Sequence, residues 1–95
     1  MKRLPIEIGS IVVSLAGRDE GRRFIVIQEV DDDFVMVANG RVRRMDRLKK
    51  KRRKHLKPTG EVVWQLRDRL ADGRPVEDHE LRFWLSEEEK KFVQV

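Results

Sequence analysis

The chain has 95 residues, of which 41% are charged, and its formal net charge is +5. This length allows one small domain with one modest core. Because the chain has no cysteine, it has neither a disulfide framework nor a thiolate metal site. No apolar run approaches the roughly 18 residues of a membrane span. Met1-Lys2-Arg3 is like the charged start of a signal peptide, but no apolar segment follows it, so we expect a cytoplasmic protein without membrane contact.

The charge is unevenly distributed along the chain. Residues 1–58 contain sixteen Lys or Arg and eight Asp or Glu, whereas residues 59–95 contain six and nine. A basic front half with an acidic back half predicts a polyanionic partner held on one side. The same boundary divides the chain into two predicted units, a β-rich unit over residues 1–58 and a helical C-terminal extension over residues 59–95 that packs on it.

Four short runs of the first half have the composition of β-strands. They are residues 11–16, 24–30, 34–38 and 41–45. Turn residues separate these runs at close spacing, which is typical of an all-β meander. Asn39-Gly40 predicts a type I′ hairpin, and the short acidic side chains of residues 31–33 predict the preceding reversal. A sheet of four or five such strands predicts a small barrel, because curling hides most of the sheet's edges.

Alternation along the strands predicts which side chains share a face. The expected groups are Ile11 with Val13 and Leu15, and Ile25 with Ile27. In the run 41–45, Val42 should point inward while Arg41 and Arg43 point outward. The aromatic residues Phe24 and Phe34 are expected in the core.

Two segments of the first half resemble a known family. Residues 11–22 (IVVSLAGRDEGR), followed by residues 25–30 (IVIQEV), look like the KOW motif of ribosomal and transcription-associated proteins. Residues 54–58 (KHLKP) resemble the segment that follows this motif in some KOW ribosomal proteins of the large subunit. Over about residues 8–59 the chain resembles short bacterial KOW-domain RNA-binding proteins, which are similar to archaeal and eukaryotic large-subunit ribosomal proteins.

This resemblance implies a fold and a ligand. The fold is an SH3-like (KOW) β-barrel, so the expected class is mainly β with α, a small barrel followed by a short C-terminal helical extension. The usual ligand is ribosomal RNA. Carried onto this chain, the motif makes Gly17 and Gly21 turn positions and assigns RNA-backbone contacts to Arg18, Arg22 and Arg23. The chain departs from the pattern at Glu20, where many members have Lys, and at Phe24, near the place of a further Gly.

A dense basic run follows the predicted strands. Residues 49–58 read KKKRRKHLKP, with seven Lys or Arg and no acid. Because Leu48 and Leu56 are the only apolar residues from 47 to 57, the run cannot bury a helical face, and like charges favour an extended chain. We therefore expect a basic arm over residues 41–57, anchored at both ends. A solvated surface run and a nuclear-type address are the alternatives, but binding to a nucleic-acid backbone is favoured because Arg41 and Arg43 continue the basic surface.

RNA is favoured over DNA as the polyanion. No helix-turn-helix or zinc-finger spacing is present, and the chain has no Tyr, so the aromatic platform of single-strand readers is missing. Recognition of shape and phosphates remains, which suits structured RNA. The candidate RNA-binding residues are Arg18, Arg22, Arg23, Arg41, Arg43, Arg44, Arg47, Lys49, Lys50, Lys51, Arg52, Arg53, Lys54, His55 and Lys57.

The back half is predicted to be helical. Thr59 is a plausible N-cap for a helix over residues 61–72, which should end at Gly73. The apolar stripe of this helix is Val62, Val63, Leu66 and Leu70. Trp64 lies off the stripe, where a packing contact is more common than a base-stacking role.

A second short helix is predicted over residues 78–85. Its apolar face is Leu81, Trp84 and Leu85, and residues 86–89 (SEEE) form a capping-box pattern for one last turn or two. Phe83, Trp84 and Phe92 form a possible patch for a protein partner. A KOW protein-interaction module that docks on a transcription or ribosome component is therefore the alternative function, and non-specific DNA binding is a third.

An enzyme is not expected. His55 and His79 have no nucleophile or carboxylate constellation around them, and no glycine-rich nucleotide loop is present. The sequence indicates no catalytic residues, no cofactor, no metal ligands and no small-molecule substrate. We expect a non-enzymatic RNA-binding protein, ribosomal or ribosome-associated, whose partners are RNA, in the first place ribosomal RNA, and ribosomal proteins.

Overall fold

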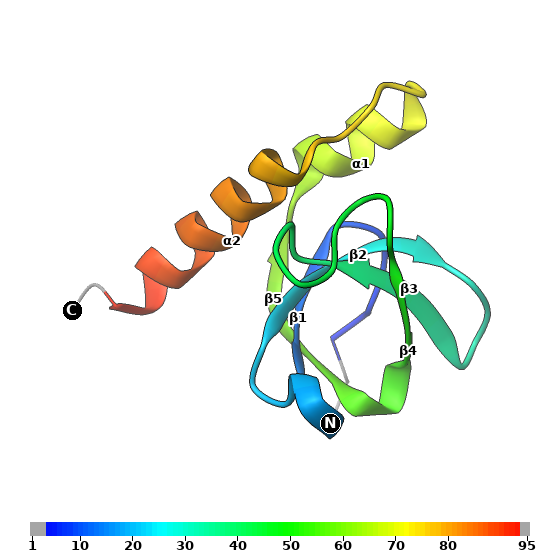
Figure 1. The fold of residues 1–95 in the computed structure, drawn as a ribbon, viewed down its shortest axis with the longest axis vertical. Coiled ribbons are helices and arrows are strands. Elements are labelled where there is room, and N and C mark those ends of the chain that lie inside the picture. The colour runs from blue at the N-terminus through cyan, green and yellow to red at the C-terminus, as the bar shows by residue number, and fades with distance from the viewer. Residues whose placement is uncertain (1–3, 94–95) are drawn as a thin grey trace.

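The computed structural model describes residues 4–93, and the side chains of residues 4–87, as an antiparallel sheet with two helices (Figure 1). The strands are β1 (Ser10–Ser14), β2 (Arg23–Glu29), β3 (Phe34–Ala38), β4 (Lys49–Arg52) and β5 (Leu56–Val62), and the helices are α1 (Trp64–Ala71) and α2 (Asp78–Val93). The strand order in the sheet is β4-β3-β2-β1-β5. The predicted class, mainly β with α, is confirmed at this level.

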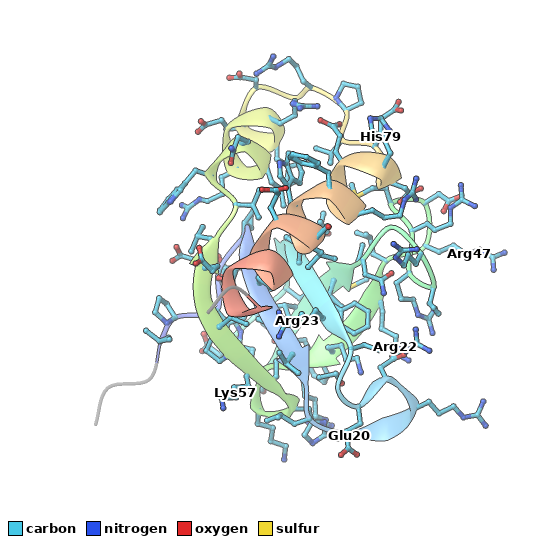
Figure 2. All side chains as sticks on the ribbon, turned by 90° about the vertical axis from the view of Figure 1, so that its left-hand side faces the viewer. Glu20, Arg22, Arg23, Arg47, Lys57 and His79 are labelled. Atoms are coloured by element: carbon cyan, nitrogen blue, oxygen red, sulfur yellow. The ribbon has the colours of Figure 1, made fainter. Side chains whose placement is uncertain are left out.

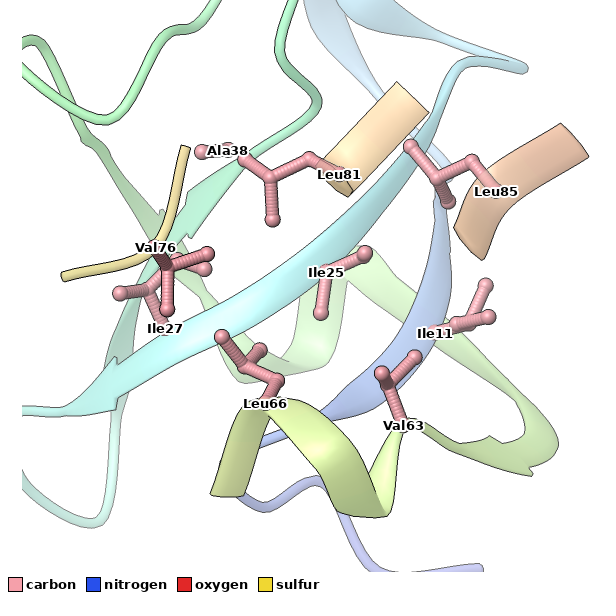
Figure 3. Close-up of a cluster of buried hydrophobic side chains, with 9 residues drawn as sticks. All are labelled: Ile11, Ile25, Ile27, Ala38, Val63, Leu66, Val76, Leu81 and Leu85. Carbon is pink, nitrogen blue, oxygen red and sulfur yellow. The ribbon is translucent and has the colours of Figure 1, made fainter. Parts of the chain in front are cut away.

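The sheet buries side chains on both faces. One face carries the cluster Val12, Phe24, Val26, Val35, Val37 and Leu56. The other face lies against α1 and α2 and carries Ile11, Ile25, Ile27 and Ala38, packed with Val63, Leu66, Val76, Leu81 and Leu85 (Figure 3). The predicted common face of Ile25 and Ile27 is confirmed, as is the burial of Phe24. Leu15 is 50% exposed instead of sharing the face of Ile11, because β1 ends at Ser14.

The acidic reversal before β3 forms as predicted. The Asp31 carboxylate accepts the backbone N–H groups of Asp33 and Phe34, each at 2.8 Å. These two bonds hold the pKa of Asp31 below its usual value, and the nearby charge of Lys50 adds to the effect. The side chain therefore closes the turn by bonding to its own backbone.

The predicted hairpin at Asn39-Gly40 is wrong. A type I′ turn needs a positive φ at both Asn39 and Gly40. Gly40 has one, of 74°, but Asn39 does not, because no described residue other than glycine has a positive φ. The Asn39 carboxamide oxygen instead accepts the N–H groups of Arg41 and Arg43, both at 3.0 Å. No strand forms over residues 41–45, and Val42 is 53% exposed rather than inward. Residues 39–48 are a loop, which we call the 39–48 loop.

The predicted arm over residues 41–57 is also wrong, because its second half belongs to the sheet. Strand β4 pairs with β3, with Lys51 opposite Val35, and β5 pairs with β1, with Leu56 opposite Ser14. Backbone pairing on both sides fixes the direction of each side chain in the basic run. The carboxylate of Asp19 pairs with Lys49 and Lys51 and so reduces the repulsion among the cations of the run.

Helix α1 starts later than predicted. Thr59 lies in β5, where its hydroxyl donates to the Ile11 carbonyl at 2.9 Å instead of capping a helix. Pairing with β1 keeps residues 56–62 extended, so the helix begins at Trp64. The predicted stop is confirmed, because Gly73 follows the helix with a φ of 72°. Leu66 is buried and Leu70 packs beside it, as the predicted stripe requires. Val62 and Val63 are not on the helix, because Val62 lies in β5 and Val63 precedes α1.

Helix α2 is longer than predicted. It runs to Val93 without a break at Ser86, because the Glu and Lys of residues 87–91 favour helix continuation over a new start. Leu81 and Leu85 are buried and Trp84 packs against the same cluster. The predicted apolar face is confirmed.

The two helices are joined by a charged pair. Arg69 donates to both carboxylate oxygens of Glu80, and the Glu77 N–H donates to the same group at 3.1 Å. The hydrogen bond from Arg69 is the main reason why the pKa of Glu80 lies below its usual value. A carboxylate with a lowered pKa stabilises the folded state above its unfolded pKa, and this contribution is lost as the pH falls through the folded pKa.

We expect Glu80→Gln to lower the thermal midpoint at about pH 7, and this difference from the wild type should shrink progressively as the pH falls below about 4.3, the usual pKa of Glu. The measurement is a series of thermal melts across this pH range. The control is Asp68→Asn, which alters an exposed carboxylate on α1 and should match the wild type throughout. A constant difference between Glu80→Gln and the wild type at all pH values would contradict the assignment.

Candidate nucleic-acid interface

The outward face of β4 presents two cations to solvent. The Nζ of Lys50 lies 4.5 Å from the centroid of the Phe34 ring, and the guanidinium carbon of Arg52 lies 4.9 Å from it. Both residues are exposed, and Phe34 is half-buried beneath them. Alternation along the strand places them on one face. The ring attracts both cations. This attraction orients the two side chains but leaves their positive charge unneutralised.

The inward face of β4 is neutralised inside the protein. Lys51 is only 9% exposed, and its Nζ donates to the Ser14 hydroxyl at 3.0 Å and lies 3.4 Å from the Asp19 carboxylate. Lys49 and Arg22 lie 3.7 Å from the same carboxylate. Lys51, predicted to bind RNA, is therefore part of the interior and is not on the open surface.

Arg53 is also committed within the protein. Its Nε donates to the Asp31 carbonyl at 3.0 Å, one terminal nitrogen donates to the Ile6 carbonyl at 2.7 Å, and the other donates to the Glu29 carboxylate at 2.9 Å. This side chain joins the N-terminal segment to the turn before β3. Its position after β4 explains why Arg53 is structural while Arg52 faces solvent.

Helix α2 holds the 39–48 loop in place. The Asp78 carboxylate accepts the Met45 N–H at 2.7 Å and the Arg44 Nε at 3.2 Å. In the other direction, a terminal nitrogen of Arg82 donates to the Gly40 carbonyl at 2.6 Å. The loop is thereby fixed at both ends, and the position of Arg41 follows from these bonds.

A set of cations stays open to solvent. The predicted residues that are exposed and make no ion pair within residues 4–87 are Arg18, Arg41, Arg47, Lys50, Arg52, Lys54 and Lys57. His55 is also exposed, whereas Arg23 and Arg43 are half-buried. Figure 2 shows Arg22 and Arg47 toward one side of the molecule and Lys57 toward the other. The predicted residues therefore surround the sheet more than they form one compact patch.

Acids of the back half pair with cations of both halves of the chain. Glu80 pairs with Arg69, and Asp72 pairs with Arg74 at 3.1 Å, so both acids meet cations of their own half. Among the side chains of residues 59–87, Asp78 pairs with a front-half cation, Arg44.

The predicted aromatic patch is only partly visible. Phe83 is 59% exposed, Trp84 packs against the core, and the side chain of Phe92 lies outside the described residues. Trp64 is equally exposed, with the Arg67 guanidinium 5.0 Å from its ring. Trp84 therefore serves packing, as its helical spacing with Leu81 also predicts.

Two residues of this region were not predicted from the sequence. Asp19 is the internal counter-ion of β4, but its place in a loop with three arginines gave no sign of burial. Arg82 holds the 39–48 loop and lies beside the predicted cations. The sequence feature that could have pointed to Arg82 is that it is the one Lys or Arg within residues 78–87.

The sequence is similar to those of several known proteins. No protein-family model matches the chain, and no described helix is long and apolar enough to cross a membrane. Over 58 residues the chain is 40% identical to large ribosomal subunit protein eL14 of Desulfurococcus amylolyticus, 31% to that of Staphylothermus marinus and 29% to that of Pyrobaculum arsenaticum. The match takes in 61% of this chain and 56–60% of the length of these relatives. The predicted resemblance is therefore confirmed: this chain has homologues among the large-subunit ribosomal proteins of archaea.

Proposed function

We propose that the protein is a non-enzymatic RNA-binding protein of the ribosome, either a constituent of the large subunit or a factor bound to it. An SH3-like barrel of the KOW type would contact structured ribosomal RNA through its phosphates, with ribosomal proteins as neighbours in the cytoplasmic ribosome. We propose that the barrel unit extends through β5, which ends at Val62, rather than to residue 58. The helical extension then covers the outer face of the barrel.

The observation that carries this proposal is the set of cations around the sheet that are exposed and make no ion pair within residues 4–87. Asp19 neutralises Lys51 and Glu29 pairs with Arg53, whereas Lys50, Arg52, Lys54 and Lys57 remain open over one short stretch of chain. Cations on a rigid strand meet phosphates with little loss of conformational freedom. The homology to ribosomal proteins supports RNA as the polyanion.

The salt dependence of binding tests the proposal. If about six phosphates are engaged, affinity for a structured RNA should fall roughly a thousandfold between 50 and 200 mM salt. Replacing Lys50, Arg52, Lys54 and Lys57 with Gln should lower the slope of log affinity against log salt by about 3 to 4. The thermal midpoint should change little, because these side chains are exposed. Fluorescence anisotropy with a labelled ribosomal RNA stem-loop measures both quantities.

Arg74→Gln is the control for the loss of an exposed cation outside this surface. Arg74 is exposed and pairs only with the exposed Asp72 in the described residues, so its loss should leave RNA affinity within about twofold. Wild-type affinity in the fourfold variant would refute RNA binding through this surface. Duplex DNA of the same length, added as competitor at about 150 mM salt, separates RNA binding from non-specific DNA binding.

A further inference from the structure

A second basic site lies between the sheet and helix α2. It is a cleft of about 310 Å³. Its lining residues are Gly21, Arg22, Arg23, Asn39, Arg41, Arg82, Leu85 and Ser86. Four of these are arginines and none is acidic, although α2 itself is an acidic helix. We call this site the arginine cleft.

The four arginines come from three separate parts of the chain. Arg22 and Arg23 lie just before and at the start of β2, Arg41 lies in the 39–48 loop and Arg82 in α2. Figure 2 shows Arg22 and Arg23 on the side of the molecule that α2 crosses. Convergence of like charges from three elements opposes folding unless a counter-charge offsets it. The Asp19 carboxylate lies 3.7 Å from Arg22 and is shared with Lys49 and Lys51.

Arg82 is pre-organised in the cleft. One terminal nitrogen donates to the Gly40 carbonyl at 2.6 Å, which holds the half-buried side chain in one orientation. A guanidinium has five N–H donors, so this bond leaves others for a ligand. An anchored guanidinium loses little freedom on binding, and its planar fork matches two oxygens of a phosphate.

Ser86 adds a hydroxyl donor at the same place. It lies one helical turn after Arg82, so the two side chains project from the same face of α2, and it is exposed. Asn39 is buried below, and its carboxamide oxygen is already bonded to the backbone of the 39–48 loop. The polar groups of the cleft are therefore mostly donors, which suits an anion and disfavours a cation.

We propose that the arginine cleft binds one phosphodiester of the RNA backbone, with Arg82 and Ser86 acting together with Arg22 and Arg41. This inference rests on the proposed function and adds α2 to the interface. The helix then has two roles, since it packs on the sheet through Leu81 and Leu85 and contacts the ligand through the adjacent Arg82 and Ser86. RNA would be held from two sides, by the outward face of β4 and by the cleft.

Ser86→Glu tests the cleft without removing any packing or the Arg82–Gly40 bond. The control is Gln65→Glu, which adds the same charge at an exposed position of α1. Glu is a better helix former than Ser, so both variants should fold. With a labelled ribosomal RNA stem-loop, Ser86→Glu should bind on the order of tenfold more weakly and with a salt slope smaller by about 1, whereas Gln65→Glu should stay within about twofold of the wild type.

A second measurement does not depend on RNA. Inorganic phosphate titrated into ¹⁵N-labelled full-length protein should shift the side-chain Nε–Hε signal of Arg82, and Ser86→Glu should abolish the shift. Equal RNA affinities for Ser86→Glu and Gln65→Glu, in a wild type that binds RNA, would overturn the cleft and leave the proposed function standing. No RNA binding by the wild type would overturn the proposed function and this inference together, whereas loss of binding only in the β4 variant would overturn the cleft alone.

Discussion

Replacing Gly40 with alanine is expected to destabilise the protein by about 3 kcal/mol. Gly40 has a φ of 74°, a conformation that costs an L-residue about 1–2 kcal/mol. A methyl group at this position would also overlap the Asp78 carbonyl oxygen and lie 3.1 Å from the Cγ of Arg82. Overlap in a well-packed region adds about 1–3 kcal/mol. Chemical denaturation measures the change in unfolding free energy.

Gly73→Ala is the matched control. Gly73 has nearly the same φ, 72°, but a methyl group there would meet nothing within 4 Å. It should therefore cost only the backbone term of about 1–2 kcal/mol. Equal losses for the two substitutions would show that the close approach of the 39–48 loop to α2 contributes nothing.

The close contact between Gly40 and α2 also affects the candidate RNA interface. The same contact region contains the bonds from Asp78 to Met45 and from Arg82 to Gly40. A displaced loop would move Arg41 relative to β4. In the Gly40→Ala protein we therefore expect weaker RNA binding than the loss of stability alone explains, under conditions where the protein is fully folded.

The sequence predicted three of the five strands, β1, β2 and β3, because each of these carries a local signal. The β3 run of Phe34, Val35 and Val37 is apolar and bounded by turn residues, and its limits are correct. The alternation that groups Ile25 with Ile27 also held. The paired strand β4 was missed because Lys49–Arg52 has no apolar residue, so no pattern indicated burial. Its pairing depends on a β3 edge and on an acid far away in the sequence.

The 39–48 loop shows why a strong local signal can mislead. Asn-Gly favours a tight hairpin when the following residues pair with the preceding strand. Here Asp78, from a helix much later in the chain, bonds to Met45 and Arg44 and stabilises a wide loop instead. Contacts at such separation leave no trace in the local pattern. The run after β4 was misread for the same reason, since Arg53 bonds to the distant Ile6 carbonyl.

For the candidate interface, the sequence predicted which residue types take part but not how they are arranged in space. A run of cations gives the sign of the partner's charge, but it does not show which cations the protein itself uses. Alternation alone would have divided β4 into Lys49 and Lys51 on one face and Lys50 and Arg52 on the other, had the strand been recognised. Burial of one face then decides which pair remains available.

Asp19→Asn is expected to destabilise the protein by about 3 kcal/mol, the second large effect. The Asp19 carboxylate is 10% exposed and lies 3.4 Å from the equally shielded Nζ of Lys51. Removing one partner of such a pair leaves a poorly hydrated charge uncompensated, which costs about 3–5 kcal/mol in a fully buried site. The Ser14 hydroxyl, which accepts from Lys51 at 3.0 Å, remains and offsets part of this loss. Asp72→Asn, at an exposed pair with Arg74, is the control and should stay within about 0.5 kcal/mol of the wild type.

Lys51→Met distinguishes a structural role from an RNA-binding role for the same cation. Methionine matches the length of the lysine stem and removes the charge that Asp19 neutralises. The double variant Asp19→Asn/Lys51→Met should therefore be more stable than the sum of the single effects predicts, by about 1–3 kcal/mol. RNA affinity should be unchanged in Lys51→Met but reduced in Lys50→Gln, its neighbour on the outward face. Additive losses in the double variant, or a loss of RNA affinity in Lys51→Met equal to that in Lys50→Gln, would show that Lys51 acts on the open surface after all.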